Sequence, residues 1–150
     1  MTKTVQIYCD GGCRGNGKEE NIGAWGAVLL FGDKTKEISG TKLNTTNNQM
    51  ELMACIEAIK LVNILYNIEC YCDSAYIVNC MNDKWYKKWQ QNGWKTSQKK
   101  PVENKKLWME LIELIDSHPT KFFKVKGHVG VEYNEKADQL VNEAMDKIEK

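Results

Sequence analysis

Apolar and polar positions along the chain predict three strands, followed by helices and strands in alternation. Residues 4–10 alternate between the two classes and then meet a glycine-rich cluster, which predicts a strand followed by a loop. Residues 23–32 and 35–43 are typical of the arms of a hairpin or meander, with a turn between them. The first third of the chain therefore predicts an antiparallel meander.

The period changes from two to about 3.6 after residue 45. Apolar residues then recur at helical spacing up to Val62, and Thr46-x-x-Gln49 fits a capping box at the start of this helix. The segments that follow predict a buried strand, short helices, a helix, a strand and a final amphipathic helix, at 68–72, 74–92, 101–117, 121–125 and 134–148. The order βββαβααβα predicts an α/β fold with a five-stranded mixed sheet flanked by helices.

Length and composition predict one domain over residues 1–150. Hydrophobic residues make up 42% and charged residues 27% of the chain, which is usual for globular proteins. No run approaches the roughly 18 apolar residues of a membrane span, and the start "MTKTVQIYCD" lacks the apolar region of a signal peptide. We therefore expect a cytoplasmic protein that does not enter a membrane.

The six cysteines predict neither disulfides nor a zinc site. Four of them lie in apolar or strand-like runs without a secretory context, which favours reduced thiols. There is no CxxC pair, and His118 and His128 have no zinc-motif spacing to a cysteine. We expect these thiols to contribute packing alone.

The charge is segregated along the chain, although the net charge is only +1. Residues 84–106 contain eight lysines and a single acid, Glu103, so that the rest of the chain is negative. A concentrated basic segment is typical of proteins with a polyanionic partner.

Four carboxylates occupy positions where they could bind metal ions or take part in catalysis. Asp10 and Asp73 each follow an apolar strand, while Glu51 and Asp138 border the apolar stripes of two helices. Singly, they are explained as turn formers, helix-end acids or solvated edges. If they converge, an all-oxygen site favours Mg²⁺ or Mn²⁺, and two such ions suit phosphoryl displacement.

The whole chain resembles the type 1 ribonuclease H family of the bacterial type, which carries a basic protrusion. The matching stretches are "YCDGGCRGN" (8–16), "TTNNQMELMA" (45–54), "YCDS" (71–74), "GWKTSQKKPVENKKLW" (93–108), "VKGHVG" (125–130) and "NEKADQLV" (134–141). This resemblance implies a ribonuclease H-like fold. It also implies a monomeric endonuclease that hydrolyses the RNA strand of RNA–DNA hybrids and leaves 3′-hydroxyl and 5′-phosphate ends.

The resemblance also implies the roles of individual residues. Asp10, Glu51, Asp73 and Asp138 would be the catalytic ligands of two Mg²⁺ ions, with Mn²⁺ as a substitute, and His128 would assist proton transfer or product release. An imidazole pKa near 6.5 suits that task, whereas His118 before Pro119 has no expected role. The implied nucleic-acid contacts are Gly11, Cys13, Asn16, Thr46, Asn47, Asn48, Lys87, Lys88, Trp94, Lys95 and Lys99.

Two of these contact regions also follow from physical arguments. The "TTNN" stretch before Glu51 gathers free N–H groups at a positive helix end, which can hold a phosphate, although a plain cap explains it too. In the stretch that resembles the family's basic protrusion, Trp85, Trp89 and Trp94 would fix the shape of the lysine segment, unless that segment is only a solvated face.

Other functions fit the sequence less well. The stretch Gly12–Glu19 matches GxxxxGK, but Glu19 stands where a P-loop needs Ser or Thr, and a strand follows instead of a helix. A non-catalytic module that binds hybrid or double-stranded RNA is the main alternative, and it leaves the four carboxylates unexplained. Related nucleases and transposases use similar acidic clusters, but their resemblance would not extend to "GWKTSQKKP" or "VKGHVG".

Overall fold

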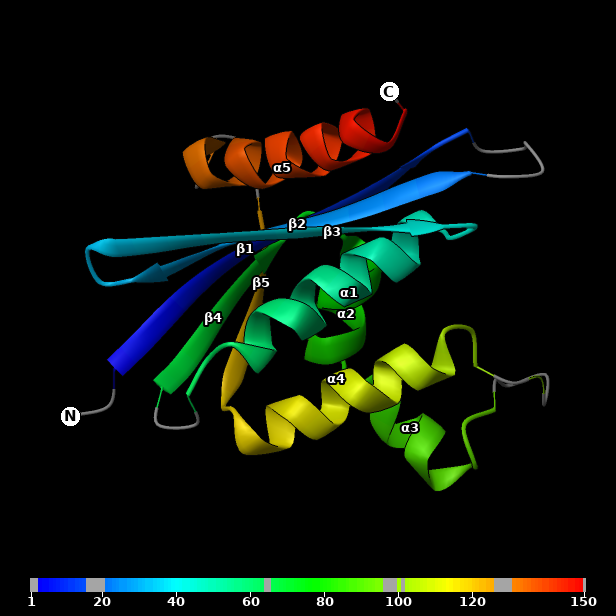
Figure 1. Ribbon diagram of the computed structural model, residues 1–150. Helices are drawn as coiled ribbons and strands as arrows, with labels where there is room; N and C mark the ends of the chain where they lie inside the picture. The colour runs from blue at the N-terminus through cyan, green and yellow to red at the C-terminus, as the bar shows by residue number, and fades with distance from the viewer. Residues whose placement is uncertain are drawn as a thin grey trace.

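The computed structural model describes residues 3–15, 21–63, 66–95, 100, 102–125 and 131–149. Figure 1 shows how its strands and helices are arranged. In chain order they are β1 (Lys3–Arg14), β2 (Ile22–Phe31), β3 (Lys34–Leu43), α1 (Asn47–Lys60), β4 (Tyr66–Cys72), α2 (Ala75–Asn82), α3 (Trp85–Gln91), α4 (Lys105–Ser117), β5 (Thr120–Lys124) and α5 (Val131–Glu149).

The strands form one mixed sheet in the order β3-β2-β1-β4-β5. The pairs β1–β2 and β2–β3 are antiparallel, whereas β1–β4 and β4–β5 are parallel. The predicted five-stranded mixed sheet with an antiparallel meander is therefore confirmed. The expected order differs in one respect, because three helices lie between β4 and β5 instead of two.

Helices cover both faces of the sheet. Figure 1 shows α5 on one face and the other four helices on the opposite face. Val5, Ile7 and Cys9 of β1 are fully buried in the core that includes α1, whereas Tyr8 belongs to the cluster packed against Ala137 of α5. This alternation follows from the period of a strand, and it gives β1 a different role on each face. Among the described residues, no helix is both long and apolar enough to cross a membrane.

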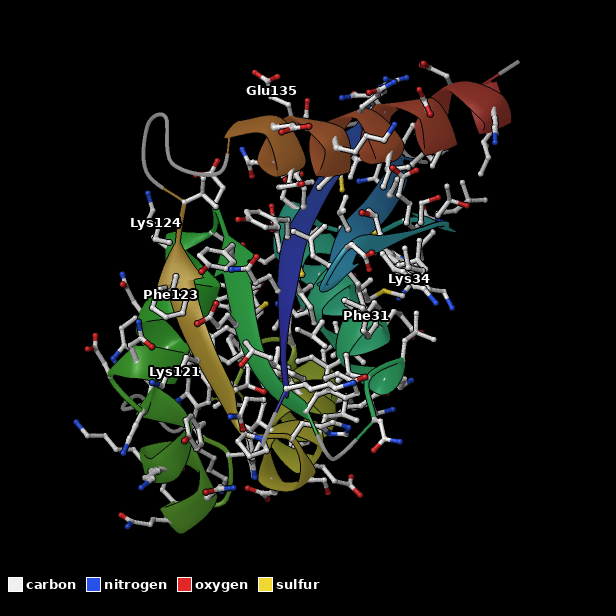
Figure 2. All side chains as sticks on the ribbon, turned by 90° about the vertical axis from the view of Figure 1, so that its left-hand side faces the viewer. Phe31, Lys34, Lys121, Phe123, Lys124 and Glu135 are labelled. Atoms are coloured by element: carbon white, nitrogen blue, oxygen red, sulfur yellow. The ribbon has the colours of Figure 1, made fainter. Side chains whose placement is uncertain are left out.

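Aromatic side chains continue the α5 face toward the edge strand β5. Tyr8 stacks on Tyr71 with ring centroids 4.7 Å apart, and Tyr71 stacks on Phe123 at 5.2 Å. Figure 2 shows Phe123 on β5 between Lys121 and Lys124, and its side chain is 39% exposed. The rings of Tyr71 and Phe123 thus extend the aromatic row from β1 across β4 to β5.

Strand β1 is longer than the sequence predicts. The pattern predicted a strand that ends at Asp10 and a glycine-rich loop after it, but residues 10–14 pair with residues 22–26 of β2. This antiparallel pairing gives the backbone N–H and C=O groups of the glycine-rich residues hydrogen-bond partners in β2. These residues therefore form a strand, although glycine by itself does not favour one. Gly11 also lets α1 approach, since a Cβ there would lie 2.5 Å from the backbone nitrogen of Glu51. The glycines thus form part of the sheet and bring a helix close to it.

We predict that Gly11→Ala lowers the free energy of unfolding by about 1–3 kcal/mol, because the new methyl group forces α1 away from β1. The matched control is Gly12→Ala, whose Cβ would meet its nearest atom, Val141 Cγ1, at an ordinary 3.8 Å. Urea denaturation measures both variants. Equal losses at the two positions would contradict the close contact at Gly11.

Candidate active site

Two aspartates lie side by side where β4 ends beside β1. These strands are parallel, and Cys9 pairs with Cys72, so that the next residues are Asp10 and Asp73. The prediction that two neighbouring strands bring both residues to one edge is confirmed. Asp10 lies within its strand rather than at its end, since only β4 stops there. Asp10 is half-buried, whereas Asp73 is exposed.

Glu51 approaches the same edge from α1. Its backbone lies against Gly11, directly after Asp10, and its carboxyl group is close enough to that of Asp10 for the two to interact directly. The charge of Asp73 also acts on Glu51. The Glu51 Oε2 atom is buried and has no hydrogen-bond partner among the described residues. A buried carboxyl oxygen without a donor is costly, unless a cation supplies the missing interaction.

Asp138 completes the cluster from the opposite face of the sheet. It lies on α5, and its carboxyl group interacts directly with that of Asp10. Asp10 therefore interacts with Glu51 on one side and with Asp138 on the other, and Asp73 acts on Glu51 through its charge.

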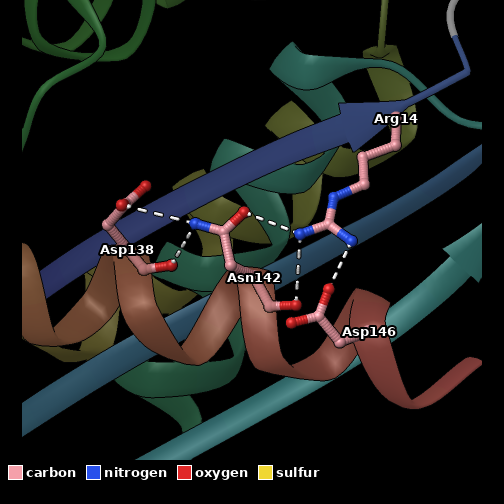
Figure 3. Close-up of polar contacts among 4 residues, drawn as sticks. All are labelled: Arg14, Asp138, Asn142 and Asp146. Atoms are coloured by element: carbon pink, nitrogen blue, oxygen red, sulfur yellow. Dashed lines mark hydrogen bonds and ion pairs between the residues drawn. The ribbon is translucent and has the colours of Figure 1, made fainter.

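A second group of residues holds Asp138 in place (Figure 3). Asn142 Nδ2 donates to Asp138 Oδ2 at 3.4 Å and to its backbone oxygen at 3.0 Å. The Arg14 guanidinium donates to Asn142 Oδ1 at 3.0 Å and to Asp146 Oδ1 at 2.6 Å. The sequence reasoning missed Asn142 and Arg14. The i,i+4 spacing of Asp138 and Asn142 was the available signal.

Burial and mutual repulsion make the cluster retain protons. The pKa of Asp10 is raised to about 7, with burial as the largest cause and the neighbouring Asp138 as the next. Burial likewise raises the pKa of Glu51 to about 9, with the negative charge of Asp10 as the next cause. Without a cation, these carboxyl groups therefore share protons at neutral pH instead of carrying full charges.

These residues fit a site for hard divalent cations. Their donors are carboxylate oxygens, which Mg²⁺ and Mn²⁺ prefer. The buried, unpartnered Glu51 Oε2 and the raised pKa of Asp10 are the features that a positive ion would relieve. Asp10, Glu51, Asp73 and Asp138 are therefore the residues that would hold the metal.

The start of α1 is fixed by more contacts than a capping box. The Thr46 side chain caps the helix by accepting from Gln49 N at 3.1 Å, as predicted. The Gln49 side chain does not return to Thr46. It accepts from Thr45 Oγ1 at 2.7 Å and donates to Asn104 Oδ1 at 3.2 Å. Asn21 lies just before β2. Its side-chain Nδ2 donates to the backbone oxygen of Thr45 at 2.8 Å, and its Oδ1 accepts from the backbone nitrogen of Thr45 at 2.9 Å.

This network leaves the predicted phosphate contacts accessible. Thr46 and Asn47 are exposed and Asn48 is half-buried at the helix start. Thr45 is only 5% exposed, so it acts as a support behind them. The sequence reasoning missed the roles of Thr45 and Asn21, because the bonds that join these two residues span 24 positions of the chain.

The lysine segment lies on α3 and the turn after it. Lys87, Lys88 and Lys95 are exposed. The Trp89 ring lies 5.9 Å from that of Trp94 and 5.7 Å from that of Trp108 on α4. Trp85 is 39% exposed, so its part in fixing the shape of the segment stays a prediction. Trp108, which is fully buried, anchors the segment through its contact with Trp89.

The remaining predicted residues divide into two groups. Gly11 and Cys13 lie on β1 beyond Asp10, and Cys13 is half-buried opposite Gly23 of β2. Asn16, Lys99 and His128 lie outside the described residues.

Comparison with known sequences gives one consistent family. A model of the family "RNase H" matches residues 2–146. The chain is 53% identical over 146 residues to a protein of Clostridium botulinum named ribonuclease H, covering 97% of this chain and 98% of that one. It is 50% identical to the ribonuclease H of Chlorobaculum parvum, with 97% of each chain covered.

Solved structures agree with the sequence comparison. A type 1 ribonuclease H with the type 2 active-site motif superposes with a TM-score of 0.81 at 31% identity, covering 96% of this chain and 72% of the other. A ribonuclease H1 in complex with an RNA/DNA hybrid superposes with a TM-score of 0.71 at 28% identity, covering 97% and 99%.

We predict that the metal-free protein loses stability as pH rises, because folding raises the pKa of Asp10 and Glu51 above their unfolded values. The folded state then binds more protons than the unfolded state above about pH 4, so charging these groups favours unfolding. Asp10→Asn should therefore be more stable than the wild type at pH 8, by about 1–3 kcal/mol, and nearly equal to it at pH 4.

Urea denaturation in EDTA at the two pH values measures this difference. The control is Asp33→Asn, in the exposed turn between β2 and β3, where little change is expected. A difference between Asp10→Asn and the wild type that does not depend on pH would contradict the shared-proton description.

Proposed function

This chain belongs to the ribonuclease H family, and on that basis we propose that it cleaves the RNA strand of RNA–DNA hybrids at the cluster of four carboxylates. The reaction is a hydrolysis that depends on divalent cations. It leaves a 3′-hydroxyl on one RNA fragment and a 5′-phosphate on the other. We further propose that the protein acts in the cytoplasm as a single-domain monomer.

The observation that carries this proposal is the convergence of the carboxylates. The carboxyl group of Asp10 interacts directly with those of Glu51 and Asp138, and the Glu51 Oε2 atom is buried without a partner among the described residues. A protein that only bound nucleic acid would gain nothing from such a cluster, because it repels phosphate until cations neutralise it. The cluster therefore favours catalysis over the alternative of a non-catalytic binding module.

We infer that Asp10, Glu51, Asp73 and Asp138 hold two Mg²⁺ ions, with Mn²⁺ as an alternative. When bound, a pair of such ions activates water and stabilises the leaving oxygen of a phosphodiester. The protein contributes the placement of the ligands. Gly11 sets the distance between β1 and α1, while Asn142 and Arg14 set the orientation of Asp138. His128 is the residue that we propose for proton transfer near the cleaved bond.

Two other surfaces support binding of a hybrid. The start of α1 offers backbone N–H groups with Thr46, Asn47 and Asn48, which suits a phosphate at a positive helix end. The exposed Lys87, Lys88 and Lys95 would face the phosphates of the DNA strand. Contacts to the 2′-hydroxyl groups distinguish RNA from DNA in such complexes, and we assign them to the residues near Gly11 and Asn16.

A strand-labelled RNA–DNA hybrid and the matching RNA duplex test the proposal, each with Mg²⁺ and with EDTA. We expect cutting of the RNA strand of the hybrid alone, and only with Mg²⁺. Asp10→Asn should lower the rate roughly a hundredfold or more, because metal-ion stabilisation is worth several kcal/mol. It should still bind the hybrid, and Asp33→Asn should cut at the wild-type rate.

Tight binding of the hybrid without cutting, in Mg²⁺ or in Mn²⁺, would instead favour the non-catalytic module. Substantial Mg²⁺-dependent activity in Asp10→Asn would overturn the role of Asp10.

A further inference from the structure

Four of the six cysteines meet at one point in the core. Cys9 comes from β1, Cys55 from α1, and Cys70 and Cys72 from β4. All four are fully buried, with 0% exposure, within the main apolar cluster. Cys70 and Cys72 are two residues apart on one strand, so they point to the same face of the sheet. Cys9 lies beside them on the neighbouring strand, and α1 places Cys55 over all three.

The four sulfur atoms have the size and arrangement of a metal site. The Sγ–Sγ distances are 3.8 Å for Cys9–Cys70, 3.8 Å for Cys55–Cys70, 3.5 Å for Cys55–Cys72 and 3.7 Å for Cys70–Cys72. All four atoms lie within 4.8 Å of one another. A tetrahedral zinc ion with Zn–S bonds of about 2.3 Å holds its sulfurs about 3.8 Å apart. The Sγ–Sγ distances are therefore close to those that such an ion requires.

We propose that Cys9, Cys55, Cys70 and Cys72 form a structural zinc site, called here the thiol site. Four sulfur ligands select a soft or borderline ion and reject Mg²⁺, so this site is chemically distinct from the carboxylate cluster. Four protein ligands also close the coordination sphere, as in structural rather than catalytic zinc sites. A divalent ion neutralises more of the thiolate charge than monovalent copper would, which matters in a buried apolar environment.

The position of the thiol site suggests what the ion would do. Cys9 and Cys72 directly precede Asp10 and Asp73, and Cys55 lies about one helical turn after Glu51. One ion would therefore cross-link β1, β4 and α1, which carry or directly precede three of the four carboxylates. This is a structural role, and it holds whether or not the carboxylate cluster is catalytic.

The spacing of these cysteines explains why the sequence did not predict the site. Familiar zinc motifs place pairs of ligands close together in loops. Here the ligands come from two strands and a helix, and only the parallel pairing of β1 with β4 brings Cys9 beside Cys72.

The experiment uses the full chain, unfolded with EDTA and a reductant and then refolded with Zn²⁺ or Co²⁺. Refolding is needed because no thiol of the site is accessible in the folded protein. A final EDTA wash removes ions from the carboxylate cluster, and mass spectrometry then measures zinc per chain. In the Co²⁺ sample, the absorption of tetrahedral thiolate-bound cobalt identifies the ligands.

We expect about one zinc ion per chain in the wild type and the cobalt–thiolate absorption after refolding with Co²⁺. Cys55→Ala should retain at least about tenfold less zinc per chain than the wild type, because one of the four ligands is missing. The matched control is Cys80→Ala. It replaces an equally buried cysteine outside the thiol site, and it should retain the metal.

A wild-type chain that refolds with native circular dichroism and retains no metal would overturn the proposal. Equal metal in Cys55→Ala and the wild type would overturn it as well. If Cys55→Ala fails to fold, the zinc content and cobalt spectrum of the wild type still decide.

Discussion

The parallel pairing of β1 with β4 is the constraint on which the rest of the structure depends. It ends at the pair Cys9 and Cys72, and β1 then continues alone on that side toward Arg14. The open edge left by β4 receives two aspartates from neighbouring positions. It also leaves room for the side chain of Glu51 to arrive from α1 and for that of Asp138 to arrive from α5. Without this difference in strand length, the carboxylates would not meet.

The carboxylate cluster lowers the stability of the metal-free protein, while the proposed function depends on it. Burial raises the pKa of Asp10 and Glu51, so the folded protein keeps protons that an unfolded chain would release. The bonds from Arg14 through Asn142 to Asp138 hold the cluster in this arrangement, and Arg14 also joins β1 to α5 through Asp146. Such an arrangement is typical of sites whose charge is balanced by bound cations.

Local pattern predicted much of this molecule, and contacts between distant segments account for what it missed. Period two and period 3.6 located the strands and helices, because each element buries one face. The glycine-rich stretch after Asp10 was assigned to a loop, since glycine favours turns and only pairing with β2 makes it a strand. The partners of Thr45 and the meeting of Cys55 with cysteines of two strands are likewise invisible to local pattern. The four carboxylates were noticed because each follows an apolar strand or borders an apolar helix stripe, and the family resemblance assigned them to one site.

The central claim is that the four carboxylates form a cation site that exchanges protons for metal. Calorimetric titration of the metal-free protein with Mg²⁺ at about pH 7, near the pKa of Asp10, tests it directly when repeated in two buffers of different ionisation enthalpy. The account predicts binding heats that differ between the buffers, because Mg²⁺ displaces protons from Asp10 and Glu51, and no such binding in Asp10→Asn. Absence of binding, or identical heats in both buffers, would contradict it.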